Sequence, residues 1–106
     1  MTDKVLVLST AGSQDEAKKI ATILVERRLA ACVNIVPRIQ SVYRWEGKIE
    51  SSEEFLLLIK TIRAREEALR SAIRELHSYE LPEFIVISIE SGSAEYLKWI
   101  EECVRE

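Results

Sequence analysis

The sequence has few of the residues that build metal centres, disulfides and membrane spans. It contains one histidine and two cysteines in 106 residues. Cys32 and Cys103 form no C-x-x-C motif, and two thiols make neither a disulfide framework nor a zinc knuckle, so we expect both to be reduced. No segment approaches the roughly 20 apolar residues that span a bilayer, and residues 5–8 are too short for a signal peptide. These absences predict a cytoplasmic location without membrane association.

A concentration of charge of one sign is also lacking. The 15 basic and 18 acidic residues are interleaved along the chain and give a net charge of −3. A nucleic-acid partner would need a clustered basic surface, so we expect none. The sequence has no H-E-x-x-H motif, no Walker loop and no local Ser/His/Asp signature. We therefore expect a binding protein and not an enzyme.

What is present is an alternation of strand and helix patterns within one expected domain, residues 1–106. A hydrophobic fraction of 47% is enough for a single core at this length. Ser13 followed by Glu16 is a capping box that starts a helix, and Gly47 suits a hairpin turn at residues 46–48. The pattern predicts strands at 4–10, 31–45, 49–61 and 84–89, and helices from Ser13 to about Leu29, at 63–77 and after Ser93.

This order, βαββαβ with an extra C-terminal helix, predicts an α+β ferredoxin-like sandwich. The two helices of the βαββαβ unit would cover one face of a four-stranded antiparallel sheet. The apolar run 55–59 shows no alternation and predicts a strand buried on both faces. In the strand at 31–45 a period of two places the following on one face: Val33, Ile35, Ile39, Tyr43 and Trp45.

That strand is too long for a compact monomer. At about 3.3 Å per residue it would reach roughly 45–50 Å, whereas a globule of this length is only about 35 Å across. Either Pro37 bends the strand or the hairpin projects. A projecting hairpin with exposed aromatic side chains is an aggregation hazard unless another chain covers it. We therefore expect an oligomer formed by strand addition.

The segment ELHSYELPEF, residues 75–84, carries the only histidine. His77 and Glu80 would meet if the helix continued, with Tyr79 beside them. Two interpretations stay open: a metal ligand or proton switch, or a histidine at a helix C-terminus with a tyrosine packed under a turn. Residues 9–13 likewise allow an anion at a helix N-terminus or a simple capping turn.

Cys32 is a soft ligand suited to reduced copper, or else a small buried hydrophobe at the head of a strand. One thiol and one imidazole are too few for a closed metal site, so other chains would have to complete it. Glu54 and Lys60 lie about 20 Å apart on one face of the third strand. They either line a cleft or occupy solvated strand ends.

In five blocks the sequence resembles the CutA divalent-cation tolerance proteins. The blocks are LAACVNI (29–35), SVYRWEGKIE (41–50), Glu54 with Lys60 and Thr61, ELHSYELPEF (75–84) and EYLKWI (95–100). The resemblance implies a ferredoxin-like chain in a homotrimer, joined through sheet edges and the long hairpin as in the PII signalling proteins. It also implies binding of copper and other divalent metal ions, a contribution to metal tolerance, and no established reaction.

Residue roles follow from the resemblance by position. Cys32 matches a cysteine implicated in copper binding, and His77 and Glu80 fall in the family's H-P-Y-E-x-P-E motif, where this chain has Ser78 in place of the usual proline. Residues that match the lining of clefts between subunits are Tyr43, Trp45, Glu54, Lys60 and Tyr79. The alternative function is a PII-like signalling module that binds a small anionic ligand in these clefts.

Overall fold

The computed structural model describes residues 2–105, so Met1 and Glu106 of the expected domain lie outside the described residues. The strands are β1 (Lys4–Ala11), β2 (Cys32–Trp45), β3 (Lys48–Ile62) and β4 (Ile85–Ser88). The helices are α1 (Gln14–Glu26), α2 (Glu66–Leu76) and α3 (Ala94–Val104), with a 3-10 turn at Arg63–Arg65. The predicted order of elements is confirmed, with a shorter last strand.

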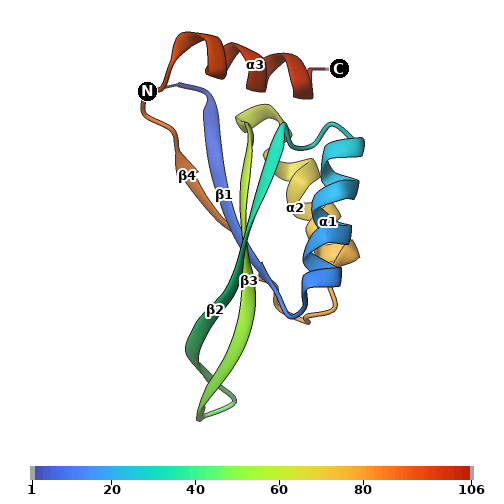
Figure 1. Cartoon of the computed structure of the whole chain (residues 1–106), viewed down its shortest axis with the longest axis vertical. Coiled ribbons are helices and arrows are strands. Elements are labelled where there is room, and N and C mark those ends of the chain that lie inside the picture. Colours follow the sequence, from blue (N-terminus) through green and yellow to red (C-terminus); the bar gives the residue numbers. More distant parts are fainter. Residues whose placement is uncertain (1, 106) are drawn as a thin grey trace.

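The sheet has the order β2-β3-β1-β4 and every neighbouring pair is antiparallel. Helices α1 and α2 cover one face, while α3 crosses the end of the sheet near the N-terminus (Figure 1). Between the two helices and the sheet lies the main core, in which Leu24, Leu57 and Leu69 are fully buried. This is the α+β ferredoxin-like sandwich that the sequence predicts.

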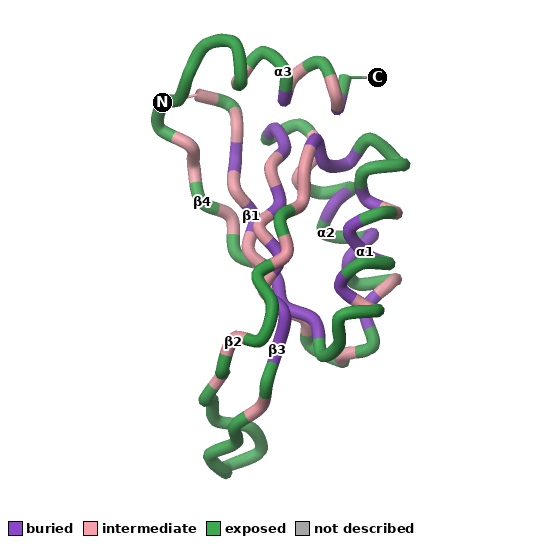
Figure 2. Tube along the Cα trace, viewed as in Figure 1, coloured by how far each residue is buried: buried purple, intermediate pink, exposed green. Residues whose placement is uncertain are grey.

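The β2-β3 hairpin projects from this core, as expected. The molecule measures 44 × 25 × 22 Å, and residues 42–51 at the tip are exposed (Figure 2). Glu46 and Gly47 both have positive φ, 49° and 80°, which is the two-residue type I′ turn that matches the twist of paired strands. The long strand therefore leaves the globule instead of folding back.

A β-bulge interrupts β2 at Pro37 and changes which side chains share a face. The register shifts by one residue between Val36 and Ile39, and Arg38 has a φ of 56°. Proline lacks the N–H that a regular ladder requires, so a bulge suits it. Because one extra residue reverses the alternation, Tyr43 lies on the face opposite to Ile35. The prediction of a single face from residue 31 to 45 is wrong for this reason.

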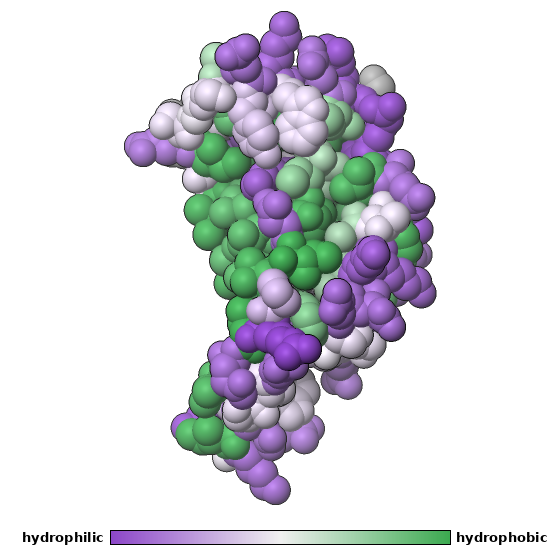
Figure 3. All heavy atoms as spheres, in the orientation of Figure 1, coloured by the Kyte–Doolittle hydropathy of each residue, from purple (hydrophilic) through white to green (hydrophobic). Residues whose placement is uncertain are grey.

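Strand β3 is covered on one face only. Phe55, Leu57 and Ile59 point toward the helices and are buried, whereas Leu56 and Leu58 between them are partly exposed. Within the described chain, burial on both faces is not found. The uncovered face continues onto β1, β2 and β4, and Figure 3 shows hydrophobic side chains gathered between α3 and the hairpin. Its apolar members are Leu6, Leu8, Val36, Leu56, Leu58, Ile85 and Ile87.

None of the helices in residues 2–105 is both long and apolar enough to span a membrane.

Candidate functional site

Helix α2 ends at Leu76, and the chain then crosses the end of β1 as an irregular segment, residues 77–84. His77 has an extended backbone, with ψ of 143°, so Glu80 is not one helical turn away from it. The condition for a helical pairing of His77 with Glu80, that the helix continues past His77, is therefore not met. The segment is instead a corner that joins α2 to β4.

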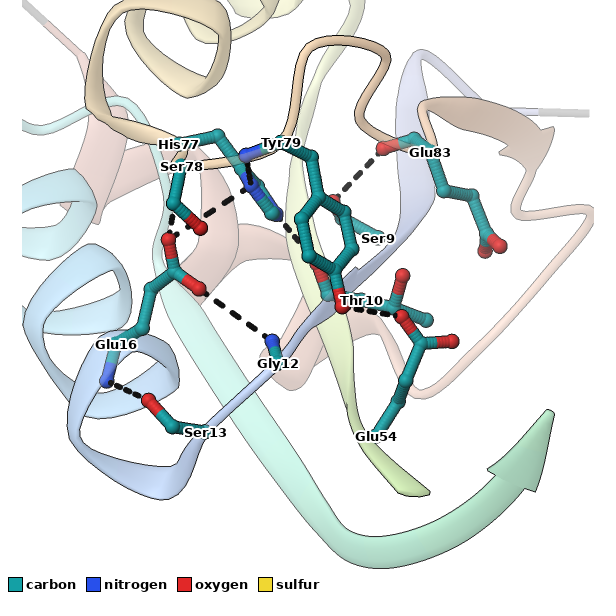
Figure 4. Close-up of polar contacts among 10 residues, drawn as sticks. All are labelled: Ser9, Thr10, Gly12, Ser13, Glu16, Glu54, His77, Ser78, Tyr79 and Glu83. Carbon is teal, nitrogen blue, oxygen red and sulfur yellow. Dashed lines mark hydrogen bonds and ion pairs between the residues drawn. The ribbon is translucent and has the colours of Figure 1, made fainter. Parts of the chain in front are cut away.

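The His77 ring ties this corner to β1 (Figure 4). Its side chain is fully buried, and Nε2 lies 2.6 Å from the carbonyl oxygen of Thr10. The backbone N–H of Tyr79 donates to Nδ1 at 3.0 Å. Because Nδ1 accepts, Nε2 carries the proton and donates to Thr10. Both ring nitrogens are engaged, and the second of the two interpretations, a structural histidine at a helix end, describes this arrangement.

Glu16 occupies the N-terminus of α1, where an anion was one expectation. The Ser13 hydroxyl accepts the backbone N–H of Glu16 at 3.1 Å, which is the predicted cap. The Glu16 carboxylate accepts the N–H of Gly12 and, at 2.8 Å, the N–H of Ser78. Burial acts to raise the pKa of Glu16, but the hydrogen bonds from Ser78 and Gly12 outweigh it and lower the pKa. The group at the N-terminus of α1 is thus the carboxylate of Glu16 from the same chain, held by the capping turn.

Tyr79 connects the corner to β3. Its hydroxyl donates to Glu54 Oε2 at 2.7 Å (Figure 4). Burial, followed by this hydrogen bond and the charge of Glu54, raises the pKa of Tyr79 well above its ordinary value. Glu54 is only 8% exposed, and it forms no ion pair with the described residues. A carboxylate that is nearly buried and held by one neutral donor is left without a compensating positive charge.

A cleft of about 640 Å³ lies between this corner and the base of the hairpin. Its lining includes three acidic residues, Glu54, Glu80 and Glu83, and the aromatic residues Tyr43 and Trp45. The other lining residues are Thr10, Ser41, Val42, Tyr79, Leu81 and Pro82. None of these described lining residues is a lysine or arginine.

The negative charge of Glu54 acts on Glu83, which lines the same cleft. Burial and then repulsion by Glu54 raise the pKa of Glu83 above its ordinary value. Its backbone carbonyl accepts a hydrogen bond from the Ser9 hydroxyl at 2.7 Å, which fixes the residue after the proline turn. Glu83 was not among the candidates from sequence, although it follows Pro82 in the conspicuous L-P-E-F segment. Glu16 was predicted only as a helix cap, because nothing in the spacing links it to Ser78.

Cys32 and Lys60 lie elsewhere, opposite each other where β2 begins. The Lys60 ammonium donates to Asn34 Oδ1 at 2.6 Å and lies 5.7 Å from the centre of the Tyr96 ring. Cys32 is partly buried, with its sulfur 3.8 Å from Asn34 Oδ1. Glu54 and Tyr79 therefore share the cleft with Tyr43 and Trp45, but Lys60 does not line it. Within residues 2–105, no three His, Cys, Asp or Glu side chains form a metal-binding group.

Comparison with known proteins identifies the family. The family described as "CutA1 divalent ion tolerance protein" matches residues 5–103. The chain belongs to the CutA1 family. The divalent-cation tolerance protein CutA of Thermus thermophilus is 45% identical over 97 residues, which make up 92% of this chain and 94% of that protein. The human protein CutA is 44% identical over 93 residues, or 88% of this chain.

The match spans the relatives unequally. It covers 52% of the human CutA protein and 64% of a Xenopus laevis CutA homologue. Solved CutA structures share the fold closely. CutA from Xylella fastidiosa has a TM-score of 0.95 at 42% identity, over 97% of this chain and 99% of that one. The protein described as periplasmic CutA from Archaeoglobus fulgidus has a TM-score of 0.93 at 43% identity, over 96% and 99%. Family membership confirms the resemblance; the descriptions name tolerance to divalent ions and no reaction.

Proposed function

We propose that the protein contributes to divalent-cation tolerance by binding copper and other divalent metal ions, and that it does so as a homotrimer. The observation that carries this proposal is Glu54, a carboxylate only 8% exposed that has one hydrogen bond and no ion pair among the described residues. Burying an uncompensated charge is costly, and a bound cation removes that cost. A cation bound in the cleft around Glu54 would therefore offset the cost of burying this carboxylate.

The donors of the cleft suit a divalent ion. Glu54, Glu80 and Glu83 line the same cleft, and carboxylates are common ligands of divalent metals. Because the described side chains do not converge as a group of three ligands, a metal ion here would need further donors from water or from another chain. For a given set of oxygen and nitrogen donors, Cu²⁺ binds more tightly than the other divalent ions of its row. Copper is thus the ion that we expect to bind most strongly.

The predicted ligands Cys32 and His77 fit this site less well. His77 uses both ring nitrogens within the chain, so it has no free lone pair for a metal unless Tyr79 moves. Cys32 pairs with Lys60, six residues along β3 from Glu54, and does not line the cleft. A thiolate there would serve reduced copper only with donors from another chain. Of the three predicted metal ligands, Glu80 alone lines the cleft.

The homotrimer is supported by two surfaces that one chain leaves open. The uncovered face of the sheet carries exposed Val36, Ile85 and Ile87, and the hairpin exposes Tyr43 and Trp45, each 42%. Large apolar surfaces of this kind usually mark contacts between chains. Light scattering tests the assembly: three times the mass of one chain is expected, and a monomer would contradict it. The cytoplasmic location stays a prediction.

The alternative, a PII-like module with an anionic ligand, depends on Lys60. Lys60 donates to Asn34 and does not line the cleft, whose described residues supply carboxylates only. An anion would be repelled there unless another chain brings a positive charge. A thermal-shift screen with nucleotides and carboxylates decides, because a bound ligand raises the melting temperature by mass action.

Calorimetric titration with Cu²⁺, Zn²⁺ and Mn²⁺ tests the metal proposal. We expect Cu²⁺ to bind most tightly, and Glu54→Gln to weaken binding at least about tenfold, since a charged donor is lost. Glu53→Gln is the matched control, because Glu53 is exposed and lies on the other face of the same strand. Cys32→Ala tests the predicted thiol ligand. Equal copper binding by the wild type and Glu54→Gln would overturn the assignment to the cleft.

A further inference from the structure

Helix α3 packs on a small core of its own. Ile100 and Val104 of α3 are fully buried, and they pack with Ala31, just before β2, and with Ile62, at the end of β3. None of these four residues belongs to the main core between the sheet, α1 and α2. Two clusters that share no residue can lose their packing one at a time. The docking of α3 is therefore separable from the packing of the main core.

The segment that joins β4 to α3, residues 89–93, has the properties of a hinge. It has no regular secondary structure, and residues 90–93 are exposed. Ile89 still donates its N–H to the carbonyl of Lys4 at 3.0 Å, so the sheet side of the segment is fixed. Beyond Ile89 the segment includes Gly92, the residue type with the greatest backbone freedom. Rotation within residues 90–93 would move α3 without disturbing the sheet.

Two arginine side chains, which we call the latch, hold the other end of α3. Arg28 Nη1 donates to the carbonyl of Cys103 at 3.3 Å, and Arg65 Nε donates to the carbonyl of Val104 at 2.9 Å. The last four carbonyls of a helix have no partner within the helix, and positive charge is favourable beside them. Arg28 follows α1 and Arg65 precedes α2, so the latch joins the C-terminal end of α3 to the helical layer (Figure 1).

The backbone of Arg28 indicates that its side chain has a role. Arg27 caps the end of α1, and Arg28 after it has a φ of 58°, the left-handed conformation that glycine usually provides at this position. Glycine would adopt this backbone at a lower cost, but it has no guanidinium to bind α3. An unfavourable conformation is thus held at the residue whose side chain reaches the end of α3.

These features do not depend on the surfaces through which copies of the chain would meet. Ile100 and Val104 are buried by the chain itself. The latch lies on the side of α1 and α2, whereas the exposed apolar face of the sheet is the opposite one (Figure 1). Both the second core and the latch therefore persist in an assembled protein.

We propose that α3 is a lid that opens on the hinge at residues 89–93 as one unit, while the sheet, α1 and α2 stay folded. Isolated helices shorter than about 12–15 residues are marginal in water, so the 11-residue α3 would unfold once released. Opening uncovers Ala31 and Ile62, and it separates the Tyr96 ring from the Lys60 ammonium, 5.7 Å from its centre. The latch sets how often the lid opens. This inference goes beyond the proposed function and does not rest on the cleft around Glu54.

Native-state hydrogen exchange of the assembled protein, followed by mass spectrometry at low urea concentrations, tests the lid. We expect the slowest amides of α3 to be at least about 100-fold less protected than those of β1 and β3. Their protection should also fall less steeply with urea, because a local opening exposes less surface than complete unfolding. Equal protection and equal urea dependence in α3, β1 and β3 would mean that α3 opens only with the whole molecule, which overturns the inference.

Variants of one loop test the latch in the same experiment. Arg28→Ala removes the guanidinium, and we expect the protection of α3 to fall about three- to tenfold, with β1 and β3 within about twofold of the wild type. Arg28→Gly should lower the protection of α3 in the same way, while α1 is protected as well as before or better, because glycine relieves the backbone.

Arg27→Ala is the matched control for these variants. Arg27 is the neighbouring exposed arginine, and it pairs with Glu75 of α2 at 3.5 Å. An exposed ion pair of this kind contributes little, so we expect the protection of α3 to stay within about twofold of the wild type. Unchanged protection of α3 in both Arg28 variants, or an equal loss in α3, β1 and β3, would overturn the inference.

Discussion

Replacing Ser78 with proline tests how the corner between α2 and β4 is held. The N–H of Ser78 donates to Glu16 Oε2 at 2.8 Å, and proline has no N–H to donate. The preceding residue, His77, already has the extended backbone that a residue before proline adopts, with ψ of 143°. His77 therefore needs no change of conformation, and the lost hydrogen bond dominates the result.

Two opposing terms decide the magnitude of this effect. Loss of a hydrogen bond to a partly exposed carboxylate costs about 1 to 2 kcal/mol. Proline reduces the conformational entropy of the unfolded chain, which raises the free energy of unfolding by about 0.4 to 1 kcal/mol. We therefore expect Ser78→Pro to lower the free energy of unfolding by about 1 kcal/mol. Urea unfolding measures it, with protein concentration held constant because assembly shifts the midpoint.

The same substitution in a Glu16→Ala background is the control. Without the acceptor there is no hydrogen bond to lose, so proline should now stabilise the protein by about 0.4 to 1 kcal/mol. The difference between the two backgrounds isolates the coupling of Ser78 with Glu16. If proline stabilises both backgrounds equally, the contact contributes nothing and our explanation of the corner is refuted.

Three further predictions concern the same framework. Tyr79→Phe removes the only hydrogen bond that Glu54 receives within residues 2–105, and should lower the free energy of unfolding by about 1 to 2 kcal/mol in urea titrations; no change would contradict it. The folded pKa of Glu16 is lowered from 4.5, so its stabilisation is present above pH 4.5 and is lost as the pH falls through the folded pKa; Glu16→Gln should flatten acid unfolding curves below pH 4.5. The folded pKa of Glu83 is raised from 4.5, so its ionisation opposes folding as the pH rises through the folded pKa; Glu83→Gln should be more stable than the wild type at pH 7, and lower stability would disprove the repulsion.

The fold followed from sequence because its signals are local. Ser13 caps α1 as its spacing predicts, and Gly47 takes the positive φ of a hairpin turn. The excess length of β2 correctly indicated a projecting hairpin. The error came at Pro37, where a bulge of one residue moved Tyr43 and Trp45 to the other face. A period of two alone cannot reveal such a reversal, because Pro37 marks where a bulge is tolerated but not whether a residue is inserted there.

The candidate site was predictable only in part, since it joins segments far apart in the chain. Tyr79 and Glu54 were both candidates, but nothing in the sequence shows that their side chains meet at 2.7 Å. His77 attracted a metal interpretation because it is the only histidine, while its engagement with Thr10 depends on how α2 ends. Glu83 became a candidate only once burial and the nearby charge of Glu54 were visible.

In our proposal the carboxylates around Glu54 form a cation site. Anomalous diffraction at the copper absorption edge, from crystals of the assembled protein soaked with Cu²⁺, tests it most directly. We predict a copper peak in the cleft within bonding distance of Glu54, Glu80 or Glu83, about 2.0 to 2.2 Å from an oxygen. The peak should disappear in Glu54→Gln. Copper found only at Cys32 or His77, with an empty cleft, would contradict the claim.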